Sequence, residues 1–336
     1  MRGSENQTDM SQVELIDRPK LVSIVVPCHN EEESLPILLD ELDRVCAGVR
    51  EASESYSFEV VLVDDGSQDG TLEEMRRQAN RQDRDSFQLR YLSFSRNFGK
   101  EAALYAGLEH SKGDLVATMD ADMQDPPALL PKMLTILETE DYDNVATCRT
   151  SRKGEPPFRS FCAKLFYKLI NKISEADIKD GARDFRLMKR SMVDAILSLK
   201  ERNRFSKGIY GWVGFKTKWL EFENIERAAG SSSWSFTQLL WYSLEGIIAF
   251  SEVPLNIASV AGALMFAVSV IYAFGIVAGK LVFGNPVLGW SSLACIILFV
   301  GGLQLLCLGV IGKYLAKDYI ENKNRPLYFV RESNFE

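Results

Sequence analysis

Two long stretches without a charged residue lie near the C-terminal end of the sequence, Val253–Gly279 and Leu281–Gly312. Within them, Leu255–Ala278 would form a helix about 36 Å long, and Ser291–Ile311 is only slightly shorter. Because the hydrocarbon core of a bilayer is about 30 Å thick, either segment is long enough to cross it. The pattern excludes a fully soluble protein and predicts a polar body followed by two membrane-spanning helices.

Charged residues beside these stretches predict their orientation. Lys313, Lys317, Lys323 and Arg325 follow the second stretch, and Lys and Arg are enriched in cytoplasmic loops. Two spans return the chain to the side that it left. We therefore expect a multi-pass protein of the inner (plasma) membrane, with the body, both termini and a 313–336 tail in the cytoplasm.

The remaining sequence suggests further divisions. Residues 1–18 contain no apolar segment of the signal-peptide type and are expected to be disordered. A folded body is expected over 19–230, followed by an interfacial amphipathic helix over 231–254, and a second, basic amphipathic helix is expected near 158–173. Either amphipathic helix could instead pack on the body. The six cysteines form no CxxC pair, which indicates a reducing compartment.

Positive charge is concentrated in one part of the body. Arg149–Lys207 contains 16 Lys or Arg against 7 Asp or Glu, although the whole chain has a net charge of −7. A sequence pI of about 5.2 gives no nucleic-acid signature. A basic block upstream of membrane segments suits anionic headgroups or a phosphate, and a solvated helical face is the alternative.

Apolar, β-branched runs alternate with helical patterns through the first 150 residues, which predicts an α/β fold with a doubly wound, mostly parallel sheet. The expected strands are Leu21–Pro27, Phe58–Asp64, Leu89–Phe94, Leu115–Met119 and Asn144–Cys148, and the expected helices are Ser34–Cys46, Thr71–Gln82, Lys100–His110 and Pro127–Glu138.

Polar residues follow four of these strands. Because ligands bind at the carboxyl ends of parallel strands, we expect the four clusters to meet at one edge of the sheet. They begin at Cys28, Asp64, Ser95 and Asp120.

Asp120-x-Asp122 is the strongest single feature among these clusters. Two carboxylates one residue apart can share a hard divalent cation, and Gln124 could add a neutral oxygen. Such a metal would neutralise a departing diphosphate. The chain contains neither GxxxxGK[ST] nor GxGxxG after the first strand, and its two histidines have no hydrolase-like spacing. The sequence therefore favours a nucleotide-diphosphate site over a P-loop, dinucleotide or histidine-based site.

Seven strings together resemble glycosyltransferase family 2, and within it the polyprenyl-phosphate glycosyltransferases. They are VVPCHNEEESL, VLVDDGSQDGT, SFSRNFGKEAAL, MDADMQDPP, DFRLM, ERNRFSKGIYGWVG and ERAAGSSSW. The resemblance extends from about Leu21 to Arg325. It implies a GT-A fold, a UDP-sugar donor, Mg²⁺ or Mn²⁺, a polyprenyl phosphate acceptor and inversion of the anomeric centre.

The same resemblance implies roles for individual residues. Nucleotide binding falls to Pro27, Glu31, Asp64, Asp65, Gly99, Lys100, Asp120 and Arg227. Metal binding falls to Asp120, Asp122 and Gln124, and catalysis to Asp122, Arg149 and Arg159, the two arginines receiving the lipid phosphate. From the residues themselves, Asp184 could orient the acceptor in catalysis or form a structural salt bridge.

The sequence thus predicts an inverting, membrane-anchored transferase that moves a hexose, glucose first among them, from a UDP-sugar to undecaprenyl phosphate for envelope glycans. Two alternatives remain, a processive polysaccharide synthase and a non-catalytic scaffold that binds nucleotide sugars. Homo-oligomerisation is compatible with the apolar hairpin.

Overall fold

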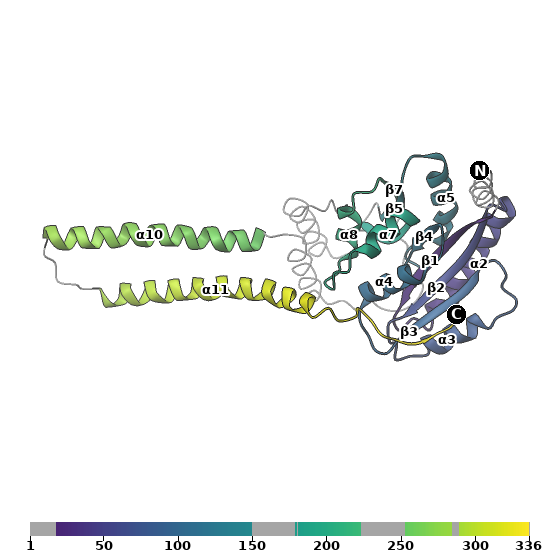
Figure 1. Cartoon of the computed structure of the whole chain (residues 1–336), viewed down its shortest axis with the longest axis horizontal. Coiled ribbons are helices and arrows are strands. Elements are labelled where there is room, and N and C mark those ends of the chain that lie inside the picture. Colours follow the sequence, from purple (N-terminus) through teal and green to yellow (C-terminus); the bar gives the residue numbers. More distant parts are fainter. Residues whose placement is uncertain (1–17, 150–178, 180, 223–252, 284–288, 336) are drawn as a thin grey trace, which may run out of the picture.

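The structure is a computed structural model that describes residues 18–149, 179, 181–222, 253–283 and 289–335. Figure 1 shows a sheet-containing body at one end and two long helices extending from it. The elements are β1 (Lys20–Cys28), α2 (Ser34–Ala52), β2 (Tyr56–Asp64), α3 (Thr71–Ala79), β3 (Gln88–Phe94), α4 (Lys100–His110), β4 (Leu115–Thr118), the 3₁₀ turn η1 (Pro127–Leu129), α5 (Leu130–Thr139), β5 (Asn144–Arg149), β6 (Ala182–Lys189), α7 (Arg190–Ser198), α8 (Ser206–Trp212), β7 (Thr217–Phe222), α10 (Val253–Phe283), α11 (Trp290–Asn322) and β8 (Val330–Ser333).

The described strands form an eight-stranded sheet in the order β7-β5-β6-β4-β1-β2-β3-β8. β1 pairs in parallel with β2 and β4, and β2 pairs in parallel with β3. β6 runs antiparallel between β4 and β5, whereas β8 runs antiparallel at the far edge beside β3. The mostly parallel sheet with helices on its faces confirms the predicted α/β class and is the arrangement expected of a GT-A fold.

Both faces of the sheet are buried. Along β1, Ile24 packs into a core cluster with residues of α2 and α5, whereas the neighbouring Val25 packs into a second cluster with residues of α4. Successive side chains of a strand point to opposite faces, so a strand covered on both sides needs apolar residues at nearly every position. This requirement explains why the strands were recognisable as continuous apolar runs.

Gly107 sets how closely α4 approaches the sheet. A Cβ atom at this position would lie 2.2 Å from Val25 Cγ1 and 3.3 Å from Val63 Cγ2. We expect Gly107→Ala to destabilise the protein by about 1–3 kcal/mol, because the helix must move away from the sheet.

Gly48 provides the matched control, since it lies on the exposed face of α2 and a Cβ added there would have nothing within 4 Å. Gly48→Ala should be neutral or stabilise the fold by up to about 1 kcal/mol. Thermal unfolding of both variants in detergent micelles tests the comparison, and equal stabilities would contradict the close approach of α4 as the cause.

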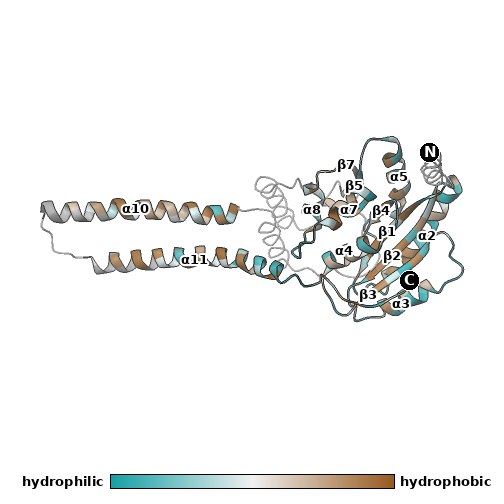
Figure 2. Cartoon of the chain, in the orientation of Figure 1, coloured by the Kyte–Doolittle hydropathy of each residue, from teal (hydrophilic) through white to brown (hydrophobic). Residues whose placement is uncertain are grey.

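The two long helices, α10 and α11, lie side by side (Figure 1), with Cys307 Sγ 3.7 Å from the Ala258 carbonyl oxygen. Two windows are long and apolar enough to cross a membrane, Val253–Tyr272 and Phe299–Asn322, and neither is buried in the described structure. Figure 2 shows the apolar colouring of both helices, which gives way to polar residues where α11 reaches the body. Soluble monomers rarely expose apolar surface on this scale, so the helices indicate membrane association.

The C-terminal region differs from the expected 313–336 tail. α11 continues to Asn322, and Val330–Ser333 joins the sheet of the body as β8. The first part of the expected tail therefore continues α11, and its last part pairs with the sheet of the body. The expected amphipathic helices at 158–173 and 231–254 and the N-terminal residues 1–17 lie outside the described residues.

Candidate active site

The strand order reverses between β1 and β4, because β2 and β3 continue the sheet on one side of β1 and β4 begins the other side. The loops that leave the carboxyl ends of β1 and β4 therefore diverge, and such a switch point is where α/β sheets bind ligands. The four polar clusters expected from the sequence all follow strands that end at this edge.

Asp64 ends β2, Asp65 follows it, and both are almost fully buried. The Asp64 carboxylate accepts hydrogen bonds from Ser93 Oγ at 2.6 Å and from the Ser67 amide at 2.9 Å. The Asp65 carboxylate accepts hydrogen bonds from the backbone amides of Phe98 at 2.6 Å and Gly99 at 2.9 Å. Burial raises the pKa of Asp65, although these two amides act in the opposite direction. Asp65 thus organises the loop after β3.

Two glycines permit this loop geometry. Gly66 has a φ of +65°, and a Cβ there would lie 2.4 Å from the Arg96 carbonyl carbon, so the loops after β2 and β3 touch at this point. Gly99 has a φ of +98° directly before α4. Residues that have a Cβ atom rarely adopt such backbone angles. The turn at Gly99 directs the chain into α4, whose first residue is Lys100.

The end of β1 approaches the same loops. Cys28 pairs with Asp64 in the sheet register, and the half-buried Pro27 precedes it. His29 Nδ1 lies 3.1 Å from the Asp65 carbonyl oxygen. The Glu31 amide donates to Thr71 Oγ1 at 2.8 Å, and its carboxylate accepts a hydrogen bond from Ser34 Oγ. The predicted nucleotide residues of β1 and β2 therefore lie at one edge.

Lys100 connects the two halves of the site. Its Nζ lies 2.6 Å from Asp120 Oδ1 and 2.5 Å from Asp184 Oδ2. Asp184 reaches this position because β6 runs antiparallel to β4, which brings the first residues of β6 to the end of β4, and Thr118 Oγ1 donates to its carbonyl oxygen at 2.7 Å. The structure thus pairs Asp184 with Lys100.

A second ion pair lies beside the first. Arg183 Nε donates to Asp125 Oδ1 at 2.8 Å, and Asp125 is fully buried. Arg183 also lies 3.4 Å from Gln124 Oε1. The backbone amide of Gln124 donates a hydrogen bond to Asp122 Oδ1 at 3.1 Å. The loop after β4 is thereby held against the start of β6.

Burial and ion pairing shift the pKa values of this cluster in opposite directions. Burial disfavours the charge on Lys100, but Asp120 and Asp184 outweigh it and raise the pKa of this ammonium well above its ordinary value. Burial likewise opposes the charge of Asp184, yet Lys100 and Lys207 hold its pKa below the usual range. For Asp125 burial prevails over Arg183 and raises the pKa to about 6. Lys100 and Asp184 are therefore both charged at neutral pH.

The residues present fit a hard divalent cation in donor type. The carboxylates of Asp120, Asp122, Asp125 and Asp184 lie in one cluster, where Lys100 and Arg183 form ion pairs and Lys207 and Arg186 also act on Asp184. Carboxylate and amide oxygens are the ligands that Mg²⁺ and Mn²⁺ prefer. Among the described residues no three His, Cys, Asp or Glu side chains converge on one point, so a metal here would need oxygens from a ligand or water.

Of the predicted arginines, only Arg149 belongs to the described residues. It ends β5, and its amide donates to the Gly181 carbonyl oxygen at 3.1 Å, just before β6 begins. Because β5 runs in the same direction as β4, Arg149 lies at the carboxyl edge, with β6 between the two strands. Arg159 and Arg227 lie outside the described residues.

Several polar residues around the site had not been assigned roles from the sequence. Arg186 is almost fully buried, with its Cζ 3.5 Å from the centre of the Tyr210 ring, and its Nε has no hydrogen-bond partner among the described residues. The Glu101 carboxylate of α4 accepts a hydrogen bond from the Ser206 backbone amide at 3.0 Å, and this bond joins α4 to α8. In the sequence, Asp184 and Arg186 alternate with apolar residues, which places both charged side chains on one face of the strand. This alternation was the signal that could have indicated a role for Arg186.

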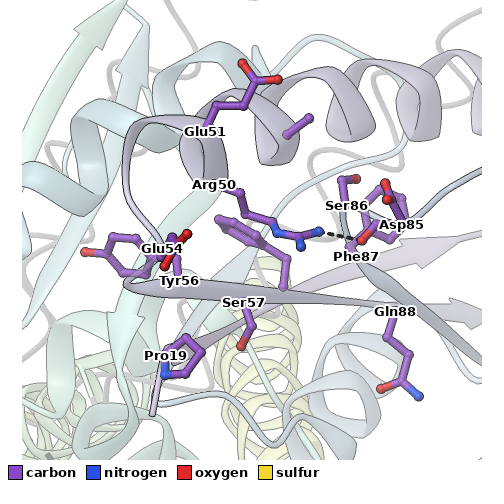
Figure 3. A pocket seen from close by; sticks show the side chains of 12 residues that line it. Pro19, Arg50, Glu51, Glu54, Tyr56, Ser57, Asp85, Ser86, Phe87 and Gln88 are labelled. Atoms are coloured by element: carbon purple, nitrogen blue, oxygen red, sulfur yellow. Dashed lines mark hydrogen bonds between the residues drawn. The ribbon is translucent and has the colours of Figure 1, made fainter. Parts of the chain in front are cut away.

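A cavity among the described residues lies elsewhere. It has a volume of about 690 Å³ and is lined by residues at the start of β2, the end of α2 and the segment before β3. Figure 3 shows Arg50 spanning it, with a guanidinium nitrogen 2.5 Å from the Asp85 carbonyl oxygen. This cavity is at the amino edge of the sheet, opposite the carboxylate cluster, and it contains none of the predicted site residues.

Comparisons with known proteins agree with the geometry. The family model described as Glycosyl transferase family 2 matches residues 23–197. The chain is 41% identical over 315 residues to the bactoprenol glucosyl transferase of Shigella phage SfII, covering 93% of this chain and 98% of that protein. It is 40% identical over 313 residues to the uncharacterized glycosyltransferase sll0501 of Synechocystis sp. (strain ATCC 27184 / PCC 6803 / Kazusa), covering 93% of this chain and 95% of the relative.

Among solved structures, glucosyl-3-phosphoglycerate synthase from Mycobacterium tuberculosis, in complex with Mn²⁺ and uridine-diphosphate-glucose, is similar at 16% identity with a TM-score of 0.46. The match covers 74% of this chain and 83% of that one.

Proposed function

The chain belongs to glycosyl transferase family 2, and from that premise we propose that it moves a glucosyl residue from a UDP-sugar to the phosphate of a polyprenyl carrier such as undecaprenyl phosphate. Relatives at 41% identity over more than nine-tenths of the chain carry the name bactoprenol glucosyl transferase, which supports both the sugar and the acceptor.

The observation that carries the proposal is the carboxylate cluster at the β1–β4 switch point. Asp120 and Asp184 lie against Lys100, and Asp122 and Gln124 lie on the same loop as Asp120. The carboxylates of the Asp120–Gln124 loop would repel a diphosphate that came close to them unless a cation lay between the two. The cluster therefore suits a donor that arrives with a divalent cation.

In the proposed reaction, a phosphate oxygen of the acceptor attacks the anomeric carbon as the bond from that carbon to the UDP oxygen breaks. Attack from the side opposite the leaving group inverts the anomeric configuration. A phosphate monoester has a second pKa near about 6, so the nucleophile is largely ionised at neutral pH and needs no strong base. Catalysis then depends on positioning and on charge compensation.

These requirements suggest roles for the residues of the site. Asp64, with Pro27 and Glu31 at the neighbouring strand end, would form the nucleoside side of the pocket. Arg149 and Arg159 would receive the acceptor phosphate, since guanidinium groups bind phosphate oxygens in pairs, and Arg227 would contact the donor diphosphate. Because Asp184 is already bound to Lys100, its proposed role is to position that lysine.

Asp120, Asp122 and Gln124 would hold Mg²⁺ or Mn²⁺, which supplies positive charge to the diphosphate oxygens as UDP leaves. Lys100, already in contact with Asp120, would add a second positive charge at the same edge. Asp65 would act indirectly, by positioning the residues before Lys100, because its carboxylate accepts hydrogen bonds from the backbone amides of Phe98 and Gly99.

The membrane hairpin fits an acceptor that is embedded in lipid. α10 leaves the body and α11 returns to it on the same side (Figure 1). We propose that the body faces the cytoplasm, where nucleotide sugars are made, and that both termini share that side. Association of hairpins into a homo-oligomer is compatible with this arrangement, and a nucleic-acid partner is not expected for a chain of net charge −7.

A transfer assay tests the proposal directly. Purified full-length protein, undecaprenyl phosphate, Mg²⁺ and a panel of labelled UDP- and GDP-sugars are combined, and the label extracted with lipid is measured. We expect label in the lipid phase from UDP-glucose above all other donors. Release of nucleotide without lipid label would reject the acceptor and favour a growing glycan instead, and the absence of both transfer and release would favour the scaffold alternative.

A further inference from the structure

The seven residues Tyr328–Asn334, here called the C-terminal strap, form an edge of the catalytic sheet. Within the strap, β8 pairs antiparallel with β3, with Ser93 opposite Glu332 and Phe94 opposite Val330. Beyond β8, the Tyr91 amide donates to Asn334 Oδ1 at 2.6 Å, and the Asn334 amide donates to the Tyr91 carbonyl oxygen at 3.1 Å. The strap thereby covers a strand edge that would otherwise be unpaired.

A side-chain ion pair fixes the strap to the body. Both terminal oxygens of Glu332 accept from Arg76 of α3, at 2.8 and 2.6 Å, and Tyr91 Oη donates to Glu332 Oε1 at 2.9 Å. Hydrogen bonding by Arg76 lowers the pKa of Glu332 to about 2, against the effect of burial. This contact is a paired, two-point bond of the kind that sets geometry as well as energy.

The strap begins at the loop that carries Lys100. The Ser95 amide donates to the Phe329 carbonyl oxygen at 2.9 Å. The Tyr328 ring stacks on the Phe94 ring, with the ring centres 4.8 Å apart. The centres of the Phe329 and Phe98 rings are 6.2 Å apart. The Phe98 amide is one of the two held by Asp65, and Lys100 follows two residues later. The loop is therefore held by Asp65 on its inner side and by the strap on its outer side.

Residues 323–327 join α11 to the strap. The Arg202 amide donates to the carboxylate of Glu321 in the last turn of α11, at 2.9 Å. The Arg202 guanidinium donates to the carbonyl oxygens of Arg325 and Pro326, at 3.1 and 2.9 Å. Figure 1 shows this C-terminal segment crossing from α11 to the sheet edge beside β3. A short, anchored connection thus joins the hairpin to the Ser95–Lys100 loop.

From these contacts we propose that the C-terminal strap positions the Ser95–Lys100 loop, with Phe329 as the positioning residue, and so aligns Lys100 between Asp120 and Asp184. Phe329 touches none of the carboxylates and acts through Phe98. Phe329 is 56% exposed, so its burial contributes little to folding, and its proposed role is to restrict the loop. The effect on transfer rests on the proposed function, whereas the effect on the loop does not.

Phe329→Ala, with Val330→Ala as the matched control, tests the proposal. Both residues are exposed apolar members of the strap, and Phe329 is the one whose ring lies beside that of Phe98 in the loop. In the full-length protein we expect Phe329→Ala to speed hydrogen exchange of the Phe98 and Gly99 amides about tenfold. We also expect kcat for transfer to fall about tenfold, because small misplacements of a charged group are costly in catalysis. Neither change is expected for Val330→Ala, and Phe329→Tyr should restore both values.

Each other outcome has a defined meaning. Wild-type exchange at Phe98 and Gly99 in Phe329→Ala would overturn the proposal. So would a uniform rise in exchange across β1 and β2 together with a lower unfolding midpoint, since the strap would then be merely structural. Local loosening of the loop in a protein whose wild type transfers no sugar would support the positioning role and reject the proposed function.

Discussion

Replacing Asp122 by alanine is expected to reduce sugar transfer to the lipid by about a hundredfold or more while the protein remains folded. Asp122 is half-buried, and its Oδ1 accepts the Gln124 amide. Losing one such bond costs about 1 kcal/mol of stability. Losing a carboxylate that would hold the charge-compensating cation at the diphosphate is expected to cost about a hundredfold to a thousandfold in rate. Lipid-extracted label and thermal unfolding, measured on the same preparation, separate the two effects.

Asp141→Ala serves as the control for this experiment. Its side chain is 86% exposed between α5 and β5, at the opposite edge of the sheet, where it pairs with Lys216. Exposed pairs of this kind contribute about 1 kcal/mol or less, so the control should transfer sugar at the wild-type rate. Wild-type transfer by Asp122→Ala in saturating Mg²⁺ would reject the assigned role of Asp122.

Replacing Arg183 by methionine is expected to be the most destabilising change near the site. Asp125 is fully buried, Arg183 Nε is 2.8 Å from its Oδ1, and its Oδ2 has no partner among the described residues. Removing one member of a buried ion pair leaves an uncompensated charge and costs about 3–5 kcal/mol. Urea unfolding of the detergent-solubilised protein should show this loss as a lower midpoint with an unchanged slope.

The double variant Arg183→Met with Asp125→Asn isolates the cause. Its buried amide carries no charge, so we expect it to recover most of the stability that Arg183→Met alone loses. A double variant as unstable as the single one would contradict the charge of Asp125 as the cause of the loss. The guanidinium would then stabilise the fold through packing and its contact with Gln124.

Local patterns predicted the body of the fold closely. α4 spans Lys100–His110 as expected, β2 and β3 end at Asp64 and Phe94 as expected, and β1 and β5 differ from their predictions by one residue at one or both ends. α2 continues to Ala52, beyond the expected Cys46. The strands were recognisable because both faces of a central parallel sheet must be apolar. The site edge was recognisable for a related reason, since every parallel strand ends at the same edge whatever its position in the order.

Contacts between distant residues were not accessible in the same way. Lys100 and Asp184 are 84 residues apart, and Arg183 and Asp125 are 58 apart. Their pairing depends on β6 running antiparallel between β4 and β5. No local periodicity specifies where a strand is inserted in a sheet or in which direction it runs. The motif around Asp184 indicated a polar role, while the choice of Lys100 as its partner required the topology.

The sequence by itself determined the two long apolar helices, the α/β body, the strand ends that carry the carboxylates and the resemblance to the family, because each depends on residues close together in the chain. Only the tertiary structure decided that Asp65 holds a loop, that Lys100 joins Asp120 to Asp184, and that the last residues return to the sheet as β8. The free energy of these contacts comes from segments brought together by the sheet order, and a residue's own neighbours in sequence carry little information about that order.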